Sequence, residues 1–160
     1  MAKVTAYIGL GSNLGRRGGT LRRAVEMLGR SGAGEVKRLS DFIRTAPEGG
    51  PPRQGPYLNA AVELETNMGP LELLEALQGI ERALGRHRAR EERWGPRACD
   101  LDILLMGELV MDSPRLMIPH PRMHQRLFVL RPLAQIAPRA THPVLRKTVA
   151  QLLAEAEATR

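Results

Sequence analysis

The sequence predicts an α+β fold in which a mostly antiparallel sheet carries helices packed on one face. Three observations support this prediction. Apolar residues alternate with other residues over 57–65, as in a strand with one buried face. Leucine and isoleucine recur every three or four residues over 70–84, as in an amphipathic helix. The expected elements follow one another as strand, helix, strand, strand, helix, strand, which is the order of a ferredoxin-like sandwich.

The first half of the chain is expected to supply three strands and one helix. Residues 4–10 predict a short strand that breaks at the glycines near its end, and a helix follows from about Thr20. Residues 35–45 predict the second strand, although their alternation is weak. Proline and glycine crowd 46–56, which predicts a loop able to act as a lid, and 57–65 form the third strand.

The second half begins with the predicted helix 70–84, which has proline at its favourable first position. Residues 86–93 are charged and lack an apolar face, so they predict a second mobile loop. The strand that starts at Asp100 should end at Gly107 and turn there into a hairpin with 109–111. Recurring prolines over the next thirty or so residues predict short helices and loops, followed by a terminal helix.

Length and composition predict a single domain over residues 1–160, with the C-terminal third extending or covering the sheet. The single Cys99 cannot form a disulfide within the chain, and the N-terminus lacks the long apolar stretch of a signal peptide. No apolar run is long enough to span a bilayer, so we expect a cytoplasmic protein. The net charge of +7 attracts anions, which include nucleic acids, acidic membranes and phosphorylated small molecules.

Asp100 and Asp102 form the most informative pair in the chain. Side chains alternate along a strand, so these carboxylates share one face and lie about 6 to 7 Å apart along the backbone, whereas Leu101, Ile103 and Leu105 are expected on the opposite face, in the core. Oxygen ligands without histidine or cysteine favour Mg²⁺, which shares its remaining positions with water and substrate phosphates. Arg93 and Arg97 just upstream supply cations that suit a metal-bound polyphosphate. The alternative is an edge strand with two solvated acids and surface arginines.

Three other groups have a functional and a structural interpretation. Tyr57 and Asn59 leave one strand face together and offer a stacking ring and a hydrogen-bonding amide to a flat heterocycle, or simply complete the strand. Glycines over 9–15 have the wrong spacing for a dinucleotide fingerprint, so we expect a tight turn that borders a ligand. Prolines flank His120, and no glutamate lies between it and His124 as in a zinc protease motif, so a zinc site is not expected. His120 is instead a phosphate contact or an ordinary loop residue.

Together these segments resemble the 6-hydroxymethyl-7,8-dihydropterin pyrophosphokinase family of folate biosynthesis. The resemblance rests on Tyr7-Ile8-Gly9-Leu10-Gly11-Ser12-Asn13-Leu14-Gly15, Arg44-Thr45-Ala46-Pro47, Tyr57-Leu58-Asn59-Ala60-Ala61-Val62, Arg93-Trp94-Gly95-Pro96-Arg97 with Asp100-Leu101-Asp102, and Ile118-Pro119-His120-Pro121. It implies an ATP-dependent diphosphotransferase with a ferredoxin-like sandwich and three active-site loops. The enzyme would move pyrophosphate from ATP to the pterin's hydroxymethyl oxygen and release AMP.

The resemblance also implies a role for individual residues. Asp100 and Asp102 would bind two Mg²⁺ ions, and Arg86, Arg88 and Arg97 would complete the catalytic set by contacting the phosphates. The implied ATP site consists of Gln78, Glu81, Arg86, Arg88, Arg97, Ile103, Arg115, His120 and Arg126. The implied pterin site consists of Thr45, Ala46, Tyr57, Asn59, Trp94 and Phe128, with the ring held between Tyr57 and Phe128.

Departures from the family pattern leave specific questions. Ala46 replaces a common proline, and Pro121 stands where an aromatic residue is frequent. The loop after the second helix is slightly longer than usual, so Arg88 and Arg90 are both candidates for one phosphate contact. The acceptor of the substrate's hydroxyl proton also stays open. We expect no second catalytic module, and we expect a monomer that binds small molecules and neither nucleic acid nor membrane.

Two other functions are compatible with parts of the sequence. Ferredoxin-like sheets with basic surfaces bind single-stranded RNA by base stacking, without catalysis. This chain has only five aromatic residues, however, and the RNA interpretation leaves the paired carboxylates facing an anionic ligand. A metal-free phosphatase or a plain ATPase is the third possibility. The nucleotide product separates these functions, because only pyrophosphate transfer to a pterin yields AMP.

Overall fold

A computed structural model describes residues 2–12, 17–45, 57–85 and 99–159. Its main sheet contains β1 (Val4–Ser12), β2 (Glu35–Leu39), β3 (Ile43–Thr45), β4 (Tyr57–Thr66) and β5 (Asp100–Met106). The strand order is β2-β4-β1-β5, with β3 also paired to β4, and every pairing is antiparallel. This topology confirms the α+β prediction and is compatible with the ferredoxin-like arrangement.

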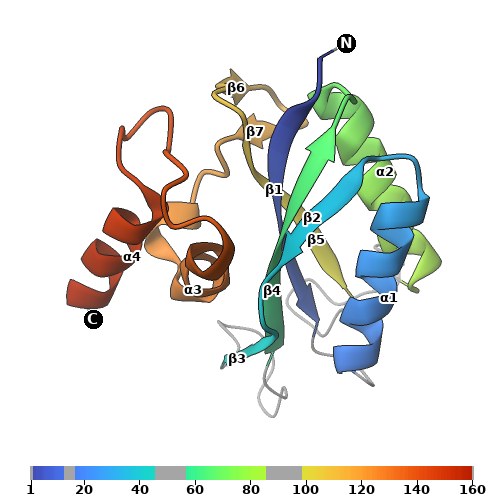
Figure 1. The fold of residues 1–160 in the computed structure, drawn as a ribbon, viewed down its shortest axis with the longest axis horizontal. Coiled ribbons are helices and arrows are strands. Elements are labelled where there is room, and N and C mark those ends of the chain that lie inside the picture. The colour runs from blue at the N-terminus through green and yellow to red at the C-terminus, as the bar shows by residue number, and fades with distance from the viewer. Residues whose placement is uncertain (1, 13–16, 46–56, 86–98, 160) are drawn as a thin grey trace.

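Helices cover both faces of this sheet (Figure 1). On one face lie α1 (Arg17–Arg30) and α2 (Pro70–Ala83), whose leucines pack on Ile8, Val62 and Leu64. On the other lie α3 (Leu127–Ile136) and α4 (Val149–Ala158), packed on Ala61 and Leu104. The C-terminal third therefore covers the sheet, as expected. In the described ranges, no helix is long and apolar enough to cross a membrane.

A β-bulge in β5 overturns one prediction about the core. Tyr7 pairs with Leu105 and the next residue, Ile8, pairs with Ile103, so Leu104 is an extra residue in the strand. Leu101 and Ile103 pack against α1 and α2 as predicted, whereas Leu104 and Leu105 pack toward α3 and α4. The expectation that Leu105 shares the face of Leu101 and Ile103 is wrong, because the bulge resets the alternation.

Three other predictions are corrected. The strand expected over 35–45 is split into β2 and β3, because Ser40 leaves the regular ladder: its hydroxyl accepts a hydrogen bond from the Ala61 amide at 2.8 Å. The strand expected to stop at Leu10 continues to Ser12, so Gly9 and Gly11 lie inside β1 rather than in the expected turn, and residues 13–16 of that segment lie outside the described residues. The hairpin expected from β5 is replaced by a separate pair, β6 (Met111–Asp112) with β7 (Met117–Ile118).

Candidate functional site

One row of residues runs across three neighbouring strands and joins two of the predicted groups. Gly11 of β1 pairs with Asn59 of β4 on one side and with Asp100 of β5 on the other. Strand spacing then separates the Asn59 and Asp100 backbones by about 10 Å. All three positions face away from α1 and α2, because their strand neighbours Leu58, Leu10 and Leu101 pack on those helices.

Gly11 leaves the middle of this row without a side chain. A Cβ built on Gly11 would lie only 3.1 Å from Asn59 Oδ1, so the amide already occupies part of the space beside the glycine. Among the described residues that are not chain neighbours of Gly11, no other side chain comes within 4 Å of that Cβ, which leaves backbone between an amide and a carboxylate. A flat ligand can therefore lie across β1 and reach both groups.

The neighbouring row is filled instead. Gly9 pairs with Ala61 and with Asp102, which repeats the pattern one step along the strands. A Cβ on Gly9 would meet the Leu104 side chain at 3.3 Å, so the extra residue of the bulge covers this glycine. Leu104 thus closes one side of the bare area and leaves Gly11 as its floor.

Asp100 and Asp102 lie on the same face of β5, as the alternation predicted. Asp100 is half-buried and Asp102 is exposed, and β5 lies at the edge of the sheet order β2-β4-β1-β5. Two carboxylates that reach the surface at a sheet edge fit Mg²⁺, which takes few protein oxygens and keeps positions for water and phosphates. Within the described ranges no cluster of three or more acidic, histidine or cysteine side chains offers a more complete metal cage.

Asn59 is buried and oriented by a neighbour from β3. Its Nδ2 donates a hydrogen bond to Thr45 Oγ1 at 2.6 Å, and its exposed fraction is 7%. This bond uses one amide hydrogen and leaves Oδ1 beside Gly11 as an acceptor. Tyr57 begins the same strand, is half-buried, and projects from the same face as Asn59. The structure therefore brings together three residues of the predicted pterin site, and it assigns the Thr45 hydroxyl a role that the sequence did not indicate.

The start of α3 supplies a cation and an aromatic ring. Arg126 precedes the helix, and its guanidinium carbon lies 5.3 Å from the centre of the Phe128 ring. Phe128 lies in the first turn of α3, so the two residues are not on one extended segment, yet they contact each other directly. A guanidinium on a ring face is a stable cation–π arrangement, so Arg126 is held in place before any ligand arrives.

His120 follows the cis Ile118–Pro119 peptide and is tied to the bulge. Its backbone N–H donates to the Leu104 carbonyl at 3.0 Å, and its Nδ1 accepts the Arg122 N–H at 3.3 Å. Burial first, and then the positive charges of Arg126 and Arg122, hold the pKa of His120 below its usual value. A neutral ring that accepts at Nδ1 carries its proton on Nε2, so His120 presents a hydrogen-bond donor at neutral pH.

The residues predicted to contact the nucleotide differ in burial and in the partners of their side chains. Gln78 of α2 is half-buried, whereas Glu81 is buried and its Oε2 accepts the Leu101 N–H at 2.8 Å. The Ile103 side chain lies in the core between sheet and helices, which leaves its backbone for any ligand contact. Arg115 is exposed and forms an ion pair with Glu75 at 3.7 Å. Arg86, Arg88, Trp94, Arg97 and Ala46 lie outside the described residues.

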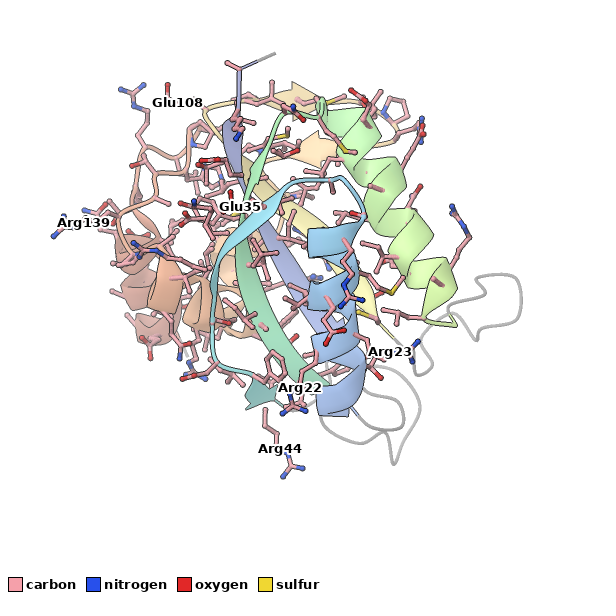
Figure 2. The ribbon with its side chains drawn as sticks, turned by 45° about the vertical axis from the view of Figure 1, so that its right-hand side comes forward. Arg22, Arg23, Glu35, Arg44, Glu108 and Arg139 are labelled. Atoms are coloured by element: carbon pink, nitrogen blue, oxygen red, sulfur yellow. The ribbon has the colours of Figure 1, made fainter. Side chains whose placement is uncertain are left out.

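Basic side chains that were not among the predicted site residues gather near the same end of the sheet. Figure 2 shows Arg22 and Arg23 of α1 and Arg44 of β3 at the end of the molecule where β3 lies. Arg22 is fixed there, with its guanidinium carbon 5.6 Å from the centre of the Phe42 ring. Because arginines are scattered along the chain, their sequence positions gave no signal for this grouping. The charge favours approach of an anionic ligand to this end.

Comparisons with known proteins agree on one family. A family model described as 7,8-dihydro-6-hydroxymethylpterin-pyrophosphokinase (HPPK) matches residues 7–138. A 2-amino-4-hydroxy-6-hydroxymethyldihydropteridine pyrophosphokinase from Bacillus subtilis is 50% identical over 131 residues, which cover 82% of this chain and 77% of the relative. The enzyme of the same name from Synechocystis is 41% identical over 154 residues, which cover 96% and 77%.

Solved structures support the fold. The Plasmodium falciparum HPPK-DHPS crystal structure with pteroate superposes with a TM-score of 0.76 over 96% of this chain and 42% of that one, at 16% sequence identity. At this identity the likeness concerns the fold alone. It confirms a mixed sheet-and-helix domain of the kind found in that larger protein.

Proposed function

Because the chain belongs to the 7,8-dihydro-6-hydroxymethylpterin pyrophosphokinase family, we propose that the row Asn59–Gly11–Asp100 is where its two substrates meet. The chain is an ATP-dependent pyrophosphokinase that transfers pyrophosphate to the hydroxymethyl group of 6-hydroxymethyl-7,8-dihydropterin in folate biosynthesis. The observation that carries the site assignment is the bare glycine between an oriented amide and a carboxylate. The pterin ring lies beside Asn59, and its hydroxymethyl arm extends over Gly11 toward Asp100.

Asn59 recognises the pterin through an acceptor whose orientation is fixed. Asn59 Nδ2 donates a hydrogen bond to the Thr45 hydroxyl, so Oδ1 faces the site and accepts N–H groups from the ring. Tyr57 and Phe128 offer ring faces on which a flat heterocycle stacks. A recognition amide that is already buried and bonded loses little rotamer freedom when the substrate binds.

Asp100 and Asp102 would hold Mg²⁺, and we propose two ions with ATP as co-substrate. The bound ions would neutralise charge on the phosphates and align them for transfer. The chain's own contribution is to fix both carboxylates on a strand that begins next to the proposed position of the pterin's hydroxymethyl group. In the transfer, the hydroxymethyl oxygen loses its proton to a base and forms a bond to the β-phosphorus. The bond from that phosphorus to the oxygen that bridges it to the α-phosphorus breaks, and AMP leaves with the bond's electron pair.

His120, Arg126 and Arg115 are proposed contacts for the phosphates and nucleotide. Neutral His120 donates from Nε2, and the fixed guanidinium of Arg126 contributes positive charge without a large ordering cost. Arg86, Arg88 and Arg97 are proposed to contact the phosphates, and Trp94 and Ala46 to contact the pterin. We also propose a monomeric, cytoplasmic enzyme, and light scattering after size-exclusion chromatography tests the monomer.

The decisive experiment identifies the nucleotide product. The protein is incubated with Mg²⁺, ATP and 6-hydroxymethyl-7,8-dihydropterin and followed by phosphorus NMR. We expect AMP and a pterin diphosphate, formed in equal amounts and only when the pterin and Mg²⁺ are both present. Accumulation of ADP or free phosphate would contradict pyrophosphate transfer, and a protein that instead binds single-stranded RNA without turnover would favour the RNA-binding alternative.

A further inference from the structure

Glu81 is the buried acidic residue among those that the structure describes. It lies near the end of α2, and only 4% of its surface is exposed. Its Oε2 accepts a hydrogen bond from the Leu101 backbone N–H at 2.8 Å. A buried carboxylate is unfavourable unless its oxygens are bonded, so this contact is a required part of the local structure.

The position of Leu101 makes this contact relevant to the site. Leu101 is the single residue between Asp100 and Asp102, and its side chain packs in the core beneath α1 and α2. On one edge, Asp100 and Asp102 are paired with Gly11 and Gly9 of β1. β5 ends the sheet order, so its other edge has no neighbouring strand in the described sheet, and there the backbone is held by Glu81.

We propose that Glu81 is a positioning residue for the metal-binding carboxylates. Its carboxylate fixes the peptide between them, which sets the height and direction of both acidic side chains relative to Gly11. This inference rests on the proposed role of Asp100 and Asp102. It differs from the role implied by the family resemblance, in which Glu81 lines the nucleotide, because the acceptor contact is to the strand backbone.

The proposal predicts different results for three replacements. Glu81→Gln keeps an acceptor oxygen of the same reach, so the bond to Leu101 should persist. Glu81→Met keeps the volume without an acceptor, and Glu81→Asp keeps the charge without the reach. We expect Glu81→Gln to stay within about 3-fold of the parent in kcat, and the other two to lose on the order of 30-fold or more. Glu26→Met, at an exposed position of α1, removes the same charge and serves as the matched control.

Metal dependence separates positioning from a nucleotide contact. For Glu81→Met and Glu81→Asp, the Mg²⁺ concentration for half-maximal activity should rise about 10-fold, while the pterin KM stays within about 2-fold. Mn²⁺ binding in the presence of a non-hydrolysable ATP analogue, followed by electron paramagnetic resonance, should weaken in parallel. A rise in the ATP KM for Glu81→Gln with unchanged Mg²⁺ dependence would overturn the proposal and make Glu81 a nucleotide ligand.

Amide exchange gives a readout that needs neither metal nor turnover. The Leu101 N–H should exchange slowly in the parent and in Glu81→Gln, and faster in Glu81→Asp. The Glu81→Asp variant gives this readout also if Glu81→Met fails to fold. Unchanged exchange in Glu81→Asp, or full activity of both impaired variants well below their Tm, would overturn the proposal. Failure of the parent to form AMP would contradict the proposed function instead, and exchange would still report whether Glu81 holds the strand.

Discussion

Replacing Gly11 by alanine adds one methyl group to the floor between Asn59 and Asp100. The new Cβ would lie 3.1 Å from Asn59 Oδ1, so the amide has to move by a few tenths of an ångström. Asn59 cannot move freely, because its Nδ2 is bonded to Thr45 at 2.6 Å. Weakening that bond costs about 1 kcal/mol, whereas alanine in a strand gains about 0.5 to 1 kcal/mol over glycine. We therefore expect the free energy of unfolding to change by less than about 1 kcal/mol.

Substrate binding should change much more than stability. The methyl group both displaces the recognition amide and fills the surface over which the pterin lies. Misplacement of reacting groups by about 1 Å can cost 10²-fold, so the smaller displacement here predicts about a 10-fold loss in kcat/KM for the pterin. Gly11→Val, which adds more bulk at the same point, should lose on the order of 100-fold or more.

The assay compares the pterin Kd from isothermal titration calorimetry, the kcat/KM from AMP release, and the free energy of unfolding in urea. Gly29→Ala at an exposed position of α1 is the matched control, because in the described part of the chain the nearest atom to its Cβ beyond its own helix would be in the Val36 side chain, at 4.0 Å. That variant should be stabilised by up to about 1 kcal/mol with unchanged activity. Normal pterin binding by both Gly11 variants would refute the assignment of this glycine to the site.

Three other predictions concern the metal-binding carboxylates, the Thr45 hydroxyl and His142. Asp100→Ala or Asp102→Ala should reduce kcat/KM by about 10³-fold, or about 4 kcal/mol of transition-state stabilisation, while Tm stays within a few degrees; near-normal kcat/KM at saturating Mg²⁺ would contradict the metal site. Thr45→Val should raise the pterin KM about 10-fold and leave the ATP KM unchanged, because the Asn59 amide loses its fixed orientation; equal changes in both would point to general damage. Burial and then the charge of His124 lower the pKa of His142. The unfolded chain therefore binds more protons at this residue, and the free energy of unfolding should decrease as the pH drops below about 6.5. Thermal melts at pH 7.5 and 5 should show a smaller loss for His142→Asn, whose Oδ1 can accept the Leu145 N–H as Nδ1 does now.

The sequence predicted features that depend on neighbours along the chain. Alternation from Tyr57 onward gave β4 with its two faces, and Pro70 with the apolar repeat gave α2. The spacing of Asp100 and Asp102 was enough to place both carboxylates on one face, because alternation along a strand is a local property. Predicting such a pair does not require knowing which strands become neighbours in the sheet.

Features that depend on cross-strand register could not be obtained in that way. Gly11 looked like part of a turn, because its role depends on the positions of Asn59 and Asp100 on other strands. The extra residue Leu104 belongs to an unbroken apolar run, so nothing in its composition distinguishes a bulge from a regular strand. The bond from Glu81 to Leu101 joins a helix to a strand edge, and helical periodicity alone predicts a solvated side chain there.

The bulge at Leu104 also bears on how this strand can change in length. Deleting one residue from a strand normally turns every following side chain to the opposite face. Here, loss of Leu104 would leave Ile8 paired with Ile103 and Tyr7 with Leu105, so the ladder itself would survive. The same deletion would uncover Gly9 and remove the carbonyl that receives the His120 N–H. A chain shortened by this single residue should therefore fold with the parental register and still lack one wall of its active site.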